Sequence, residues 1–207
     1  MPLAQVFAEF KASVGQCESL IANAHKVEAG GASVLPVIDQ KQITVAAFLN
    51  MFIAWETFLE ASLAELMTGS PTLSGRAPTR FVLAPSRAAA RALVVGVMKY
   101  FDYGNHDYVA KIARMYFQDG YPYEPHLSAI NSELADLRTM RHAAAHVTST
   151  TQTSLESLAL RIFARPAIGI ELYQLLTAND PRSLTGETVF GAYKEKLVVA
   201  AELIVRG

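Results

Sequence analysis

The sequence contains a single cysteine and almost no net charge, and both features exclude classes of protein. Cys17 is the only thiol among 207 residues, which excludes an internal disulfide framework and a cysteine-based zinc site. A net charge of −1 at pH 7 provides no overall field that attracts nucleic acid or a membrane surface. Any binding to nucleic acid must therefore depend on a local cluster of basic residues. A lone thiol is compatible with a reducing compartment, and we expect a cytoplasmic location.

The chain also lacks a long apolar run that is free of polar side chains. The nearest candidate, residues 43–55, contains Asn50 and is followed directly by Glu56. A membrane helix needs about 20 predominantly apolar residues, so we expect no membrane span and no membrane partner. Residues 1–26 interleave charged and apolar residues, which indicates a helix rather than a signal peptide.

Charged residues make up only 18% of the chain, whereas hydrophobic residues make up 51%. A chain of this length forms one sizeable core. The remaining apolar surface favours an interface with a second copy of the chain. We therefore expect a homodimer.

Apolar residues recur at spacings of three and four, which predicts an all-α fold. We expect a single domain over 1–207, with a helical core at about 40–150 and additional C-terminal helices in an extension over 151–207. Strand patterns are limited to 33–38 and 80–84. The expected helices cover residues 3–26, 39–68, 86–103, 105–118, a segment starting near 126 or 128, 154–164, 167–177 and 187–206.

The strongest predicted helix, 39–68, has Asp39 in a position suited to the N-cap and Gly69 just past its end. Its apolar residues occupy more than one face, so it must be buried on more than one side. Its length of roughly 45 Å exceeds the width of a small domain. We expect it to be kinked or shared with a partner.

The segment 141–146, Arg-His-Ala-Ala-Ala-His, crowds phosphate-binding and proton-transferring side chains into a few residues, with Arg138 one helical turn upstream. The guanidinium of Arg141 is permanently charged and fits phosphate oxygens. His142 and His146 carry imidazoles that exchange protons near neutral pH. Together these groups suffice to cleave a phosphodiester without a metal.

This motif resembles the signature of the HEPN superfamily, an Arg, a polar residue, three further residues and a His. The polar residue is usually Asn, and His142 takes its place here. The earlier Trp55-Glu56 pair is similar to the aromatic-Glu pair of the bacterial HEPN branch found near toxin and restriction loci. The resemblance covers roughly residues 40–150.

The resemblance implies a helical bundle and a metal-independent endoribonuclease that needs no cofactor. Arg141 would hold the scissile phosphate and His146 would act as general acid or base, while His142 would be either a second proton carrier or an orienting hydrogen-bonder. Attack by the 2′-OH of the RNA would leave a 2′,3′-cyclic phosphate. Two motifs from two subunits would meet at a dimer interface. The implied role is that of a toxin or antiviral defence effector, with an antitoxin or another protein of a defence operon as a further partner.

The helical positions of the motif residues favour a site completed by two chains. Residues five apart on an ideal helix differ by roughly 140° in azimuth, so Arg141 and His146 lie on different faces. His142 and His146 share a face, as do Arg138 and His142. Either the long side chain of Arg141 reaches around the helix, or a symmetric partner completes the site.

Other interpretations of these residues remain open. Arg141 could form a structural salt bridge while His146 caps its helix. The His-x-x-x-His spacing also suits zinc, although Ala143 stands where a metalloprotease has Glu. Glu56 is either a solvated carboxylate or a partner of Arg138 or Arg141, and with Arg138 it is a candidate substrate-binding residue. The alternative to an RNA-cleaving enzyme is a non-catalytic HEPN-like binding or scaffolding module in a defence or toxin–antitoxin system.

Overall fold

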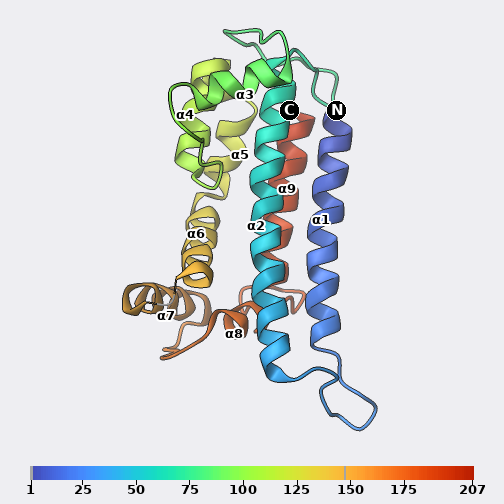
Figure 1. Cartoon of the computed structure of the whole chain (residues 1–207), viewed down its shortest axis with the longest axis vertical. Helices are drawn as coiled ribbons and strands as arrows, with labels where there is room; N and C mark the ends of the chain where they lie inside the picture. Colours follow the sequence, from blue (N-terminus) through green and yellow to red (C-terminus); the bar gives the residue numbers. More distant parts are fainter. Residues whose placement is uncertain (1, 147) are drawn as a thin grey trace. The chain divides into compact units, whose positions relative to one another are not determined.

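A computed structural model describes residues 2–146 and 148–207, and in this part of the chain it contains nine α-helices (Figure 1). A 3₁₀ turn spans Gln118–Gly120. Extended structure in the described residues is limited to isolated bridges such as Val27 with Ser33 and Arg80 with Phe117, so the expected all-α class is confirmed. The helices are α1 (Leu3–Ala24), α2 (Val37–Met67), α3 (Arg87–Val95), α4 (His106–Tyr116), α5 (Tyr123–Ala129), α6 (Asn131–Ala145), α7 (Ser149–Phe163), α8 (Leu172–Thr177) and α9 (Val189–Arg206).

Several boundaries differ from the expected ones for local reasons. α2 begins at Val37 directly after Pro36, so Asp39 lies in its first turn and is not its N-cap. α3 ends at Val95 because Gly96 has a φ of 58°, a conformation that glycine adopts without strain. α7 begins at Ser149 rather than near 154, because the Ser/Thr-rich stretch forms its cap and first turn.

The chain forms two compact units. Unit 1 comprises Met1–Ala12, Ala54–Leu134 and Lys196–Gly207, and unit 2 comprises Ser13–Ile53 and Ala135–Glu195. Each unit draws on the expected core at 40–150 and on the expected extension, so the single-domain organisation stays a prediction. α2 is one continuous helix. Its residues up to Ile53 belong to unit 2, and its residues from Ala54 onward belong to unit 1.

The core of unit 1 is built around buried aromatic side chains. The Phe10 ring centroid lies 5.9 Å from that of Trp55 and 5.1 Å from that of Phe58. Tyr123 is fully buried, and its hydroxyl donates a hydrogen bond of 2.9 Å to the Ser62 hydroxyl. Trp55, which is only 1% exposed, is therefore a core residue.

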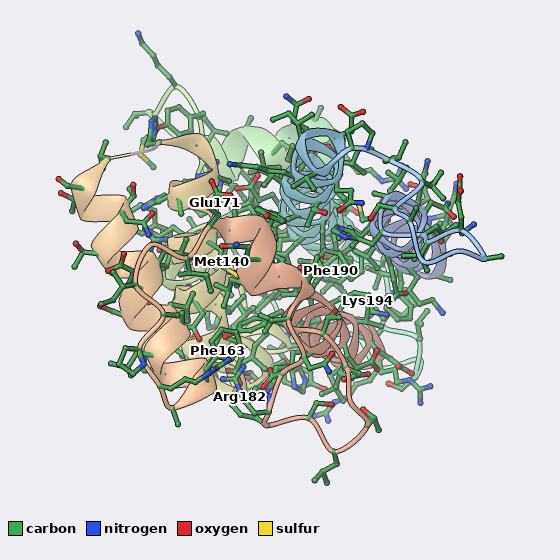
Figure 2. The ribbon with its side chains drawn as sticks, turned by 90° about the horizontal axis from the view of Figure 1, so that it is seen from below. Met140, Phe163, Glu171, Arg182, Phe190 and Lys194 are labelled. Atoms are coloured by element: carbon green, nitrogen blue, oxygen red, sulfur yellow. The ribbon has the colours of Figure 1, made fainter. Side chains whose placement is uncertain are left out.

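Unit 2 contains a buried carboxylate that joins three helices. Asp136 on α6 is only 4% exposed. It accepts hydrogen bonds of 2.6 Å from Arg161 Nη2 on α7 and from the hydroxyl of Tyr193 on α9. The guanidinium carbon of Arg182, a residue labelled in Figure 2, lies 5.7 Å from the centre of the Tyr193 ring, and the guanidinium donates two hydrogen bonds to the carboxylate of Asp180. Burial, followed by the bond to Asp136, raises the pKa of Tyr193, so its hydroxyl stays protonated and remains a donor.

α2 has the length and composition of a membrane-crossing helix, and it is the one such helix among the described residues. Within its most apolar window 44% of the residues are buried. The core helix of a soluble protein has the same properties, so this resemblance is weak support for a membrane span.

We predict that Tyr193→Phe destabilises the protein, because it removes a hydrogen bond to a buried carboxylate. Such bonds to charged groups contribute about 1.5–3 kcal/mol. Urea unfolding followed by circular dichroism measures the change. Tyr173→Phe is the matched control, since its hydroxyl forms no hydrogen bond within residues 2–146 and 148–207. Equal stability of the two variants would show that the hydrogen bond from Tyr193 to Asp136 does not stabilise the protein.

Candidate functional site

The predicted motif residues line one open pocket of about 570 Å³ at the C-terminal end of α6. Every lining residue belongs to unit 2, and α2, α6 and the start of α7 contribute to the pocket. A pocket of this volume lies in the range of small-molecule and nucleotide sites. The lining residues are Leu49, Ile53, Arg141, His142, Ala145, His146 and Thr151.

α6 presents an apolar face to the core and a polar face to the pocket. Leu134, Leu137 and Met140 are buried, as their spacing predicts. Arg141 is partly buried, whereas His142 and His146 are exposed to solvent. The two imidazoles are therefore accessible to a ligand in the pocket.

The two histidines keep a helical relationship although α6 ends at Ala145. The backbone N–H of His146 donates a 2.9 Å hydrogen bond to the carbonyl of His142, which is the bond of an α-helical turn. Residues four apart on a helix have Cβ atoms about 5–6 Å apart and lie on one face. His142 and His146 therefore stand side by side at the pocket.

Arg141 reaches the same pocket from a different azimuth. Its guanidinium carbon lies 5.2 Å from the centre of the Phe52 ring on α2. Attraction between the cation and the ring face helps to hold the side chain in place. Arg141 and His146 line one pocket of a single chain. The side chain of Arg141 thus reaches around the helix, and a symmetric partner is not needed to bring the two residues together.

Thr151 fixes the junction between α6 and α7. Its hydroxyl oxygen lies 2.6 Å from the carbonyl oxygen of His146, to which it donates, and it accepts a 3.0 Å hydrogen bond from the backbone N–H of Thr148. Thr148 in turn caps α7 by accepting from the backbone N–H of Thr151. One side chain thus connects the backbone of the second histidine to the first turn of the next helix.

Two of the predicted site residues do not line the pocket. Arg138 is a partly buried residue on α6, one turn before the motif. Glu56 belongs to unit 1, so its expected pairing with Arg138 or Arg141 stays a prediction. In the described part of the chain, no group of three or more His, Cys, Asp or Glu residues is arranged to hold a metal ion.

The sequence did not reveal four residues that build the site. Leu49, Phe52 and Ile53 come from α2, far from the motif in sequence, and their pattern showed only an apolar helix. Thr151 lies three residues after Thr148, the spacing of a capping box. That spacing was the one local signal, and it carries Thr where the usual pattern has Glu or Gln.

No protein-family model, curated protein or solved structure matches this chain. The resemblance to HEPN proteins therefore stays a prediction from the sequence motif.

We predict that Thr151→Val loosens the α6–α7 junction. Loss of the capping interactions should cost about 0.5–2 kcal/mol of stability. Thr150→Val is the matched control, because it makes the same change at an exposed neighbour whose hydroxyl has no hydrogen bond among the described residues. Chemical unfolding measures the stability, and the exchange rate of the His146 backbone amide reports the local opening. Identical amide protection in both variants would show that Thr151 does not hold His146.

Proposed function

We propose that this protein is a metal-independent endoribonuclease of the HEPN type that acts in the cytoplasm as a toxin or antiviral effector. The observation that supports this proposal is the pocket in unit 2, where Arg141, His142 and His146 meet. A fixed cation and exposed imidazoles in one pocket are the groups that phosphodiester cleavage requires.

The reaction proceeds by attack of the 2′-oxygen of the RNA on the adjacent phosphorus. The bond from phosphorus to the 5′-oxygen of the next nucleotide breaks, which leaves a 2′,3′-cyclic phosphate and a free 5′-OH. Arg141 binds the non-bridging oxygens and stabilises the charge that grows on them. His146 transfers a proton at one of the two ester oxygens. Arg138, one turn upstream on α6, is proposed to contact the flanking substrate, while Glu56 stays a predicted substrate-binding residue in unit 1.

The aliphatic side of the pocket suits the less polar parts of a nucleotide. Leu49 and Ile53 on α2 form this side, opposite the charged groups of α6. An apolar wall beside a charged group lowers the local dielectric and strengthens the interaction of Arg141 with a phosphate. The phosphate would be held on the polar side, with the sugar or base against α2.

We propose that the protein is a homodimer whose two-fold axis passes near the motif. Ile53 lines the pocket and is 55% exposed, so its apolar side chain meets solvent at the site. A second copy packed on this surface would bury it and bring the two pockets close together. An antitoxin or another defence protein is a further proposed partner.

We predict that the purified protein cleaves RNA in the presence of EDTA and leaves cyclic phosphate ends. Arg141→Ala should lower the cleavage rate by about 10²–10³-fold, since it removes charge stabilisation of the transition state. His146→Ala should lower it by about 10²–10⁴-fold through loss of proton transfer. The rates are measured on a structured and an unstructured RNA, with the ends identified by mass spectrometry.

Arg165→Ala and His126→Ala serve as matched controls, because neither residue lines this pocket. Both controls should cleave at the wild-type rate. Full activity in the Arg141 or His146 variant, or activity lost with EDTA and restored by zinc, would refute the mechanism. A folded protein that binds RNA without cleaving it would favour the binding or scaffolding module.

We predict a mass of twice the 22.5 kDa chain in light scattering after size exclusion, because a second copy packed near the motif would bury the exposed side chain of Ile53. Ile53→Lys should shift the protein toward monomer, whereas Asn50→Lys, also exposed on α2, tests charge alone. Mixing Arg141→Ala chains with His146→Ala chains should recover no activity, because both residues line one pocket of the same chain, whereas recovery would show that each site is composed of two chains. A stable monomer at micromolar concentration would contradict the proposed dimer.

A further inference from the structure

His142 occupies the position where the motif usually has Asn, and the structure gives it the same access to the pocket as His146. Both imidazoles are exposed, and both residues line the pocket. The hydrogen bond from the His146 N–H to the His142 carbonyl keeps the two side chains one helical turn apart. Neither imidazole has a hydrogen-bond partner within residues 2–146 and 148–207. Nothing among these residues therefore holds His142 in a purely structural contact.

The groups that face His142 are few. On its own helix the charged lining residue is Arg141, and His146 follows directly after the helix end. α2 contributes Leu49 and Ile53, and α7 contributes Thr151, none of which titrates near neutral pH. The pocket thus has no lining carboxylate that would pair with either imidazole. Each imidazole shares the pocket with a permanent positive charge and with one titratable neighbour of its own kind.

We propose that His142 is a further catalytic residue that works with His146 as an acid–base pair for RNA cleavage. This inference depends on the proposed function. In the forward reaction the neutral imidazole accepts the proton of the 2′-OH as the oxygen attacks phosphorus. The protonated imidazole donates its proton to the 5′-oxygen as that bond breaks. One proton is taken up and one is released, so the pair needs no metal and no further reactant.

The spacing of the pair suits the geometry of this reaction. The attacking and leaving oxygens lie on opposite sides of the phosphorus in an in-line displacement. Two imidazoles whose Cβ atoms are about 5–6 Å apart on one helix face can flank a phosphate between them. An Asn at position 142 would provide a hydrogen bond but no proton transfer.

The pair predicts how the cleavage rate depends on pH. Activity requires one imidazole to be neutral and the other protonated, so the rate should rise and then fall with pH.

The experiment compares wild type with His142→Asn and His142→Ala over the pH range in which histidine titrates, with His126→Asn as a control outside the pocket. We expect a bell-shaped profile of kcat for wild type and the control. Both His142 variants should lose one limb of the bell and fall by about 10²–10⁴-fold at the wild-type optimum. A bell that persists in His142→Asn at any rate would overturn the acid–base pair and leave the proposed ribonuclease standing.

Proton NMR of the histidine C2–H signals tests the pair without relying on cleavage. The probe is uridine 3′-monophosphate at constant pH, and its phosphate should shift the signals of both His142 and His146 when it binds between them, while the signal of His126, outside the pocket, stays in place. A nucleotide that shifts only one of the two signals would overturn the pair even if wild type cleaved no RNA. Failure of cleavage while both signals shift would instead count against the proposed function alone.

Discussion

The buried carboxylate of Asp136 is the constraint on which the arrangement of unit 2 depends. A charge that is 4% exposed must be fully hydrogen-bonded, because an unpaired buried carboxylate is strongly destabilising. Arg161 and Tyr193 meet this need from two other helices. Arg161 extends its guanidinium toward solvent, so the ion pair is only partly desolvated and the Tyr193 bond is the buried component. α6 is thereby fixed in rotation as well as in position.

A fixed rotation of α6 determines which residues reach the pocket. With Leu137 and Met140 in the core, His142 and His146 lie on the side that faces away from it. The chain then turns at the junction held by Thr151, so that α7 begins directly beside the second histidine. The site is therefore formed where a helix ends and the next begins, against a side of α2 that remains apolar. The polar groups of the pocket lie close together in the sequence, within residues 141–151, whereas its apolar wall comes from α2, about 90 residues earlier.

This division explains what could be predicted from the sequence. Helix periodicity depends on neighbours three and four residues apart, so the helices and the crowding of Arg141, His142 and His146 were visible without a structure. The α7 start was misjudged because Ser and Thr compete with the backbone for hydrogen bonds in many contexts, and only the reciprocal Thr148–Thr151 bonds make them a cap here. The contributions of Phe52 and Ile53 depend on tertiary packing, which an apolar stripe does not specify.

The position of Arg141 alters the reason for expecting a dimer. Its separation from His146 by five residues suggested that a second chain had to supply the missing half of each site. Instead, both residues line one pocket, and Arg141 packs on Phe52 of its own chain. A partner is thus not needed to bring the cation and the imidazole together. Ile53 is 55% exposed beside the charged groups of the pocket. In the proposed dimer a partner at this position would exclude water from the pocket, and the interaction of Arg141 with a bound phosphate would become stronger.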